Sequence, residues 1–339
     1  MPSITSRQIR LAARPEGRPG PEHFRFEDEV LPAPAEGQVV LQNLYLSLDP
    51  YMRGRMSAAK SYSPPVEIGA VMEGGSVSRV LESRAPGFTA GDIVLSHTGW
   101  QSHAVVDTAG LTKLDPKLAP VSTALGVLGM PGFTAYTGLL TLGQPKAGET
   151  VVVAAATGPV GSAVGQIARI KGARAVGIAG GAKKCAFLRD ELGFDAAIDH
   201  RAPDFAEQLK AACPEGIDVY FENVGGAVWD AVFPLLNTFA RVPVCGLISQ
   251  YNGAGASGAE SVPGLMRQVL TRSLTIRGFI QREFADQRPA FLREMAEWIA
   301  KGELRYREDI VEGLENMPEA FAGLLEGRNF GKLLIKLAD

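Results

Sequence analysis

The sequence has few of the residues that form disulfide frameworks and metal sites. Its 339 residues include three cysteines and four histidines. Cys185, Cys213 and Cys245 are an odd number with wide spacing, which suits neither a set of disulfides nor a paired-cysteine metal site. Residues 1–128 contain no cysteine, and their three histidines lack the paired spacing of zinc ligands. We therefore expect no structural disulfide and no bound metal.

The sequence also lacks a concentration of positive charge and a long apolar run at its start. The formal net charge is −3 at pH 7 with Lys and Arg spread evenly, whereas surfaces that bind nucleic acid concentrate positive charge. Residues 1–20 mix arginines and prolines without a continuous apolar core, so they predict neither a secretory signal nor a membrane span. We expect a cytosolic protein that binds neither nucleic acid nor membranes.

What is present is enough apolar sequence for two domains, because 46% of the residues are hydrophobic. Up to about residue 130, short β-rich runs such as 38–46, 67–80 and 92–95 are broken by Gly and Pro, which predicts a barrel-like all-β domain. From Thr150 onward, short apolar runs alternate with helix-like segments, as in a doubly wound parallel α/β sheet. The predicted parallel strands begin near residues 150, 175, 196, 217 and 241. We expect residues 332–336 to form a strand that completes the first domain.

Two details of the second domain can also be predicted. Apolar residues recur at helical spacing after Pro289, namely Phe291, Met295, Trp298 and Ile299, and predict a helix. Pro243 lies in a predicted strand although proline removes a backbone donor, so we expect it near the beginning of that strand.

Residues 151–170 form the strongest local motif, an apolar strand followed by a glycine turn and an amphipathic helix. Gly158 and Gly161 let the backbone approach a pyrophosphate, and Gly165 lets the helix pack against the sheet. The helix N-terminus offers N–H groups and the positive end of its dipole. Ala156 stands in place of the usual first glycine. The motif predicts a dinucleotide-binding turn.

The end of the second parallel strand indicates which dinucleotide binds. NAD-specific sites place an acidic side chain there, about 20 residues after the glycine turn. This sequence instead has Gly180 and Gly181, followed by Lys183 and Lys184 at the start of the next helix, with no carboxylate to repel a 2′-phosphate. Both lysines are also compatible with ordinary solvated helix positions. The missing acid and the reach of Lys184 favour NADPH.

The lack of a metal-ligand set bears on the reaction. Without a Lewis acid, the reduction of a plain ketone to an alkoxide is poorly supported. Hydride addition to an activated alkene is easier, because it gives a delocalised enolate that a few hydrogen-bond donors stabilise. The sequence therefore favours α,β-unsaturated carbonyl substrates.

Several segments together resemble a known family. They are residues 48–56, 129–136, 155–161, 222–226, 245–252 and 329–332. As a set they resemble the zinc-free branch of the medium-chain dehydrogenase/reductase superfamily, which contains leukotriene B4 12-hydroxydehydrogenase/prostaglandin reductases, plant alkenal double-bond reductases and bacterial curcumin-reductase-like enzymes. The resemblance implies a GroES-like domain over residues 1–128 completed by 306–339, a Rossmann NADPH-binding domain over 129–305, and a homodimer.

The resemblance also implies which residues contact the cofactor. Met130 and Thr134 would lie beside the nicotinamide half, Lys184 would contact the 2′-phosphate, and His200 replaces the tyrosine that the family usually has near that phosphate. A histidine can still donate to phosphate, but its charge varies with pH. The full set of implied cofactor contacts is Met130, Thr134, Gly158, Pro159, Val160, Gly161, Gly180, Lys184, His200, Asn223, Cys245, Tyr251, Phe279 and Asn329.

Two tyrosines are candidates for a catalytic role. By resemblance, the Tyr251 hydroxyl lies near the nicotinamide ribose, and Tyr51 looks toward the substrate cleft. Either could orient the substrate carbonyl, and either could instead be a packed tyrosine with a structural partner. The proton that returns to the α-carbon can come from water, in which case no side chain is an indispensable acid.

The sequence leaves three functions open. The leading interpretation is an NADPH-dependent reductase of the C=C bond of small enones and enals. A quinone reductase of the zeta-crystallin kind shares the fold and the zinc-free site, but residues 49–53 and 250–252 favour the enone reductase. The third interpretation is a redox sensor that holds NADPH without turnover.

Overall fold

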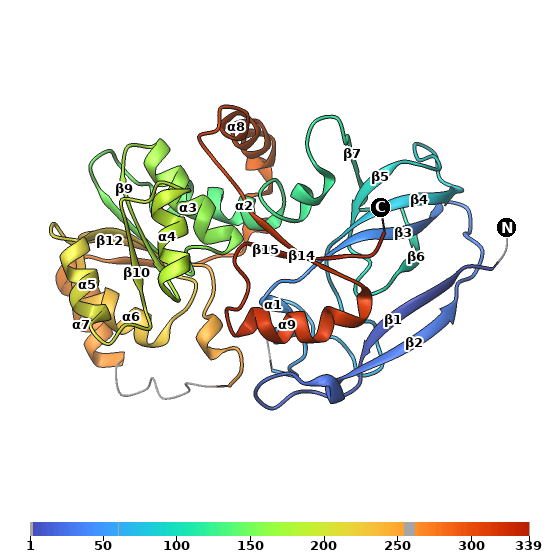
Figure 1. The fold of residues 1–339 in the computed structure, drawn as a ribbon, viewed down its shortest axis with the longest axis horizontal. Coiled ribbons are helices and arrows are strands. Elements are labelled where there is room, and N and C mark those ends of the chain that lie inside the picture. The colour runs from blue at the N-terminus through green and yellow to red at the C-terminus, as the bar shows by residue number, and fades with distance from the viewer. Residues whose placement is uncertain (1–2, 60, 254–261, 339) are drawn as a thin grey trace. The chain divides into compact units, whose positions relative to one another are not determined.

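The change of sequence pattern near residue 130 coincides with a change of structural unit. The structure is a computed structural model that describes residues 3–59, 61–253 and 262–338. Unit 1 comprises Met1–Gly126 and Glu308–Asp339, and unit 2 comprises Val127–Arg307 (Figure 1). The assignment of substrate binding to unit 1 and of cofactor binding to unit 2 remains a prediction.

Unit 1 is built on a seven-stranded sheet whose longest strand is β3 (Gln38–Ser47). One edge of β3 pairs with β4 (Ser76–Ser83), and its other edge pairs with β6 (His103–Asp107) and then with β15 (Lys332–Lys336). The C-terminal strand therefore completes the sheet of unit 1, as predicted. The remaining strands are β5 (Ile93–Ser96), β7 (Thr112–Leu114) and β14 (Glu308–Glu312), with β1 (Thr5–Leu11) and β2 (Phe24–Val30) forming a separate antiparallel pair.

Unit 1 departs from the all-β prediction in two places. The run 67–80 becomes a strand only from Ser76, because Gly74 and Gly75 interrupt it. Two α-helices, α1 (Tyr51–Arg55) and α9 (Met317–Leu325), also belong to this unit. Helix α9 buries residues at helical spacing, and its Phe321 packs edge-on against the fully buried Trp100 with ring centroids 5.5 Å apart.

Unit 2 contains a six-stranded parallel sheet of the doubly wound type. The strands are β8 (Thr150–Ala154), β9 (Arg174–Ala179), β10 (Ala196–Asp199), β11 (Ile217–Phe221), β12 (Leu236–Val244) and β13 (Thr275–Gly278). Their order is β10-β9-β8-β11-β12-β13, so the direction of the strand order reverses between β8 and β11. Ligands of such sheets bind outside the carboxyl ends of the strands at this reversal. The sixth strand, β13, was not predicted, because its four residues are exposed and form no apolar run.

The expected position of Pro243 was wrong. Pro243 lies next to the end of β12, not near its beginning, and it pairs in register with Arg277 of β13. Its carbonyl still accepts the Glu222 N–H at 3.0 Å. Because β12 ends at Val244, the missing N–H of Pro243 removes a backbone hydrogen bond only near the end of the strand pairing.

Helices connect and flank the parallel strands. Helix α8 (Arg288–Ala300) has Pro289 in its first turn and buries Phe291, Met295 and Trp298, which confirms the predicted helix. Helix α4 (Ala182–Asp190) begins at Ala182, so Lys183 and Lys184 occupy its first turn as predicted. The other α-helices of the unit are α2 (Met130–Thr137), α3 (Pro159–Ile170), α5 (Phe205–Ala212), α6 (Gly226–Val232) and α7 (Val262–Arg272).

Candidate active site

The glycine turn joins β8 to α3 at the carboxyl edge of the sheet. Ala155 follows β8 with φ of +52°, a left-handed conformation that is rare for alanine. Gly158 is the N-cap of α3, and a Cβ at Gly161 would lie 2.5 Å from the Ala155 carbonyl oxygen. A Cβ at Gly158 would meet only that same oxygen, at 3.3 Å, among the described residues. The turn is thus closely packed on its inner side. At the N-terminus of α3 no side chain of the described residues covers it, and this open space fits an approaching pyrophosphate.

Gly165 has a more specific role than the sequence indicated. A Cβ at this position would lie 1.9 Å from the ring of Phe194, which precedes β10. The glycine therefore accommodates one aromatic ring, and that ring also lies 2.9 Å from the Cβ position of Gly177 in β9. Helix α3 is held at its distance from the sheet by this ring.

The loop after β11 closes the same edge of the sheet. The Asn223 side-chain amide donates to the Ala154 carbonyl at 2.9 Å, which ties the end of β11 to the end of β8. The buried Glu222 carboxyl accepts the Val224 N–H at 2.7 Å, the Gly225 N–H at 2.9 Å and the Tyr220 hydroxyl at 2.9 Å. Burial raises the pKa of Glu222 above its usual range, although these donors oppose the shift.

Basic side chains gather where β9 ends. A Cβ at Gly180 would lie 2.9 Å from the Arg201 Nε and 3.0 Å from the His200 Nε2, so both side chains lie against this glycine. Burial, then the charge of Arg201, lowers the pKa of His200, and the charge of Lys184 acts in the same direction. Lys184 is half-buried whereas Lys183 is exposed. Three basic groups therefore surround the position where a 2′-phosphate is expected.

Sequence reasoning missed Arg201 and Asp199 at this position. The Asp199 carboxylate accepts the Gly181 N–H and the Arg201 N–H, each at 2.9 Å, and these backbone bonds help hold its pKa below the usual range. The carboxylate thereby joins the end of β10 to the turn after β9. A signal was available, because both residues lie at the end of the third strand, and adjacent parallel strands end at one edge of the sheet.

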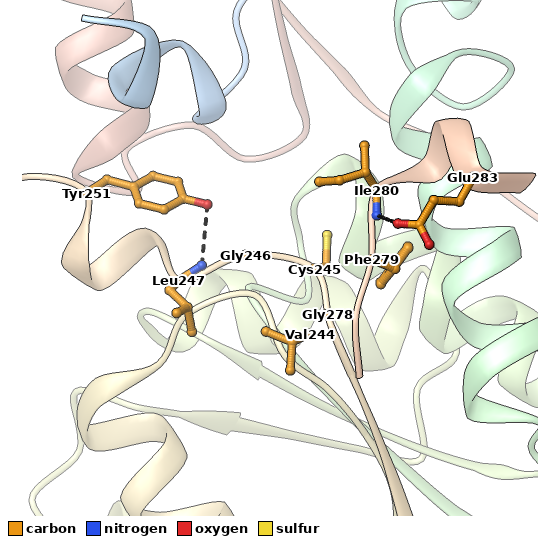
Figure 2. A pocket seen from close by; sticks show the side chains of 9 residues that line it. All are labelled: Val244, Cys245, Gly246, Leu247, Tyr251, Gly278, Phe279, Ile280 and Glu283. Carbon is orange, nitrogen blue, oxygen red and sulfur yellow. Dashed lines mark hydrogen bonds between the residues drawn. The ribbon is translucent and has the colours of Figure 1, made fainter. Parts of the chain in front are cut away.

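A pocket of about 380 Å³ lies beyond the end of β12 and is lined by residues of unit 2 (Figure 2). Three of the predicted cofactor contacts, Cys245, Tyr251 and Phe279, line it together. The Tyr251 hydroxyl oxygen accepts the Leu247 N–H at 3.4 Å. Burial, followed by the charge of Glu222, raises the pKa of the Cys245 thiol to about 12, so the thiol is neutral. Such a volume, with a mostly apolar lining and one phenol, is typical of small-molecule sites.

Glu283 is the charged residue in the lining of this pocket, and sequence reasoning did not include it. Its carboxylate accepts the Ile280 N–H at 2.7 Å (Figure 2). The same carboxylate pairs with Arg277 at 3.1 Å. The carboxylate therefore caps the short helix that follows Phe279 and neutralises a neighbouring cation.

Helix α2 carries the two residues expected beside the nicotinamide half. The Thr134 hydroxyl donates to the Met130 carbonyl at 2.8 Å, so its proton is used within the helix. A ligand atom could still donate to the hydroxyl oxygen. Thr134 is buried and Met130 is half-buried.

Tyr51 and Asn329 belong to unit 1, while the other predicted site residues belong to unit 2. The Asn329 amide donates to the Gly331 carbonyl at 2.8 Å. Burial raises the pKa of Tyr51 far above its usual range, and the charges of Asp49 and Glu73 add to the shift. Tyr51 is therefore a neutral phenol that can donate a hydrogen bond.

Two features are absent from the described residues, a cluster of metal ligands and a membrane-spanning helix. In residues 3–59, 61–253 and 262–338, no three His, Cys, Asp or Glu side chains are grouped so that they could hold a metal ion. Across the same part of the chain, no helix combines the length and the apolar character that crossing a membrane requires.

The strand order, the glycine turn at the reversal and the adjacent pocket define a dehydrogenase or reductase with a dinucleotide-binding α/β unit. Family models agree: residues 7–114 match the N-terminal domain of oxidoreductase, and residues 159–301 match a model described as zinc-binding dehydrogenase. The chain belongs to the zinc-independent medium-chain dehydrogenase/reductase family of prostaglandin, alkenal and curcumin reductases.

Individual relatives match nearly the whole chain. The NADPH-dependent curcumin reductase of Escherichia coli (strain K12) is 56% identical over 97% of this chain and 96% of its own length. Prostaglandin reductase 1 of Mus musculus is 43% identical over 95% of this chain and 96% of its own length. Among solved structures, CurA from Vibrio vulnificus in complex with NADPH is 54% identical and superposes with a TM-score of 0.95, covering 98% of this chain and 99% of CurA.

Proposed function

We propose that the chain is an NADPH-dependent reductase of the C=C bond of α,β-unsaturated ketones and aldehydes. The observation that carries the proposal is the pairing of a basic cluster at Gly180 with a mostly apolar pocket that contains a phenol. The basic cluster suits a cofactor with a 2′-phosphate, and the pocket suits the nicotinamide half of that cofactor together with an uncharged conjugated substrate. The relatives named as NADPH-dependent curcumin reductase and prostaglandin reductase 1 support this interpretation.

The residues present fit NADPH. The backbone of Gly158–Gly161 at the N-terminus of α3 would hold the pyrophosphate, and Lys184, His200 and Arg201 would hold the 2′-phosphate. Asn223, Cys245 and Phe279, with Met130 and Thr134 of α2, would line the rest of the cofactor groove within unit 2. When bound, NADPH supplies a hydride to the β-carbon of the conjugated double bond.

The side chains of the site would orient the substrate and stabilise developing charge. Because the Tyr251 oxygen already accepts the Leu247 N–H, its phenol is oriented by the backbone and can donate to the nicotinamide ribose or the enolate oxygen. Tyr51 would donate to the substrate carbonyl, since its raised pKa keeps it protonated. No carboxylic acid is needed at the α-carbon if water returns the proton.

Turnover with three classes of acceptor tests the proposed function. The purified protein is mixed with NADPH alone, with a simple enone, with a quinone or with a saturated ketone, and cofactor oxidation is followed by absorbance. We expect rapid oxidation with the enone only. Oxidation with the quinone only would favour a quinone reductase, and no oxidation with any acceptor would favour a cofactor-binding sensor.

We further infer that the chain is a homodimer and that the free edge of the parallel sheet forms the interface. In the described part of the chain β13 pairs only with β12, and all four of its residues are exposed. Exposed apolar side chains lie nearby in sequence, with Leu270 80% and Met266 60% exposed. Such edges pair readily with another strand.

Light scattering on the protein as it elutes from a size-exclusion column tests whether the chain is a dimer. We expect two chains per particle, and a monomer for Ile276→Lys, which places a charge on the edge strand. Leu118→Lys is the matched control, because Leu118 is 84% exposed in unit 1. A wild-type monomer, or dimers of Ile276→Lys as stable as the control, would contradict the interface.

A cytosolic location is also proposed, supported by three cysteines that remain free.

A further inference from the structure

Lys332 is a lysine in a buried strand, which is unusual because a buried ammonium group is costly unless it is paired. It lies at the first position of β15, in the segment 329–332 that carries part of the family resemblance. Its side chain is 3% exposed and that of its partner, Asp49, is 7% exposed. The role of this pair is not explained by cofactor binding or by the proposed catalytic residues.

The pair lies at the turn that leads into α1. The Lys332 ammonium donates to the Leu48 carbonyl and to the Asp49 carboxylate, both at 2.8 Å. The Ser47 hydroxyl donates to the second oxygen of the same carboxylate. The backbone adds a further tie, because the Leu48 N–H donates to the Leu333 carbonyl at 3.3 Å. A strand near the C-terminus therefore fixes residues 47–49.

Asp49 is the carboxylate that Lys332 contacts directly. Glu308 is the other acid near Lys332, and its carboxyl accepts the Ser122 hydroxyl at 2.8 Å. Burial raises the pKa of Glu308, and its second oxygen is buried without a partner among the described residues. Lys332 is thus in direct contact with the Asp49 carboxylate, whereas Glu308 takes its hydrogen bond from Ser122.

The fixed turn leads directly to Tyr51. The Asp49 carbonyl accepts the Met52 N–H at 3.1 Å, so the residue that Lys332 holds is bonded to the first turn of α1, which begins at Tyr51. We propose that Lys332 is a positioning residue, whose ion pair with Asp49 fixes the direction in which Tyr51 presents its hydroxyl to the substrate carbonyl. This inference rests on the proposed function of Tyr51.

The test replaces the pair by a neutral pair. Lys332→Met alone leaves a buried uncompensated carboxylate and risks unfolding, so the variant used is Asp49→Asn/Lys332→Met. We expect a folded protein whose KM for a simple enone rises about tenfold, with kcat and NADPH affinity within about twofold of wild type. In a Tyr51→Phe background, Asp49→Asn/Lys332→Met should change KM by less than about twofold. That background lacks the Tyr51 hydroxyl, so the double replacement has no hydroxyl to misplace.

The matched control is Glu149→Gln/Arg241→Met, which removes an ion pair of unit 2 in which each side chain is less than one-fifth exposed. It should lower thermal stability and leave the enone KM unchanged. An equal rise in KM in the wild-type and Tyr51→Phe backgrounds, or no rise in either, would overturn the positioning role.

A crystal structure of Asp49→Asn/Lys332→Met gives a second readout that does not depend on turnover. Residues 48–51 and the Tyr51 ring should shift while β15 stays paired with β3. An unmoved Tyr51 would refute the inference even if the protein reduces enones. If the wild-type protein reduces no enone while Tyr51 shifts as expected, the proposed function fails and the positioning of Tyr51 stands.

Discussion

At the scale of single residues, the choice of cofactor depends on the charges around Gly180. Lys184→Ala should remove the proposed charge-assisted contact to the 2′-phosphate, worth about 1.5–3 kcal/mol, or roughly ten- to a hundredfold in NADPH affinity. Arg201→Ala should act in the same direction. NADH affinity should barely change in either variant, because NADH has no 2′-phosphate. Lys183→Ala is the matched control, since Lys183 is exposed on the same turn of α4. Equal losses for both cofactors in a fluorescence titration would refute the assignment.

The two tyrosines should differ in their kinetic effects. Tyr251→Phe keeps the ring and deletes the hydroxyl that we propose as a transition-state donor. Such a loss costs about 1–3 kcal/mol, so kcat should fall roughly fivefold to a hundredfold. Tyr51→Phe should act mainly on the KM for the enone, because it removes uniform binding. Single-turnover reduction under saturating NADPH measures the step directly. An unchanged rate in Tyr251→Phe would remove that residue from the mechanism.

The sequence could predict Lys184 because a strand, two glycines and a helix start place it within one local segment. It could not predict Arg201, whose position depends on the pairing of β10 with β9. The same limit applies to the pocket, where Glu283 joins Cys245 and Tyr251 only through the pairing of β13 with β12. Residues brought together by neighbouring strands carry no shared local pattern.

At the scale of elements, the packing of α3 against the sheet depends on Gly165. Gly165→Ala places a methyl group into the Phe194 ring and should destabilise the protein by about 1–3 kcal/mol. Adding Phe194→Leu should recover part of that loss by making room. Gly264→Ala in α7 is the control. A Cβ at this position meets no atom of the described residues within 4 Å, so the replacement should stabilise the protein by about 0.5–1 kcal/mol. Denaturant unfolding measures all four proteins, and an unchanged midpoint for Gly165→Ala would show that the ring does not set the helix position.

Elements with a strong apolar run or helical period were predicted from the sequence, whereas edges and turns were not. The buried strands β8 and β11 and the helix α8 each follow a clear pattern. Strand β13 does not, because an edge strand with exposed side chains looks like a loop. Pro243 was misplaced because the general rule on proline does not say at which end of the strand the missing donor is tolerated.

At the scale of the whole molecule, we expect enone reduction to proceed without a metal. Exhaustive chelation should leave enone reduction unchanged, and elemental analysis should find no stoichiometric zinc, because the sequence has no ligand set in residues 1–128. The control is a chelator that binds metal ions in solution but does not enter the protein. It shows whether a chelator affects NADPH directly. One zinc per chain, lost together with activity, would overturn the proposed mechanism.

The most direct test of the central claim is the destination of the hydride. NADPH that carries deuterium at the reactive C4 position is mixed with the enzyme and a simple enone, and the product is analysed by NMR. We expect a saturated ketone with deuterium on the β-carbon and a solvent proton on the α-carbon. An allylic alcohol with deuterium on the former carbonyl carbon would contradict it.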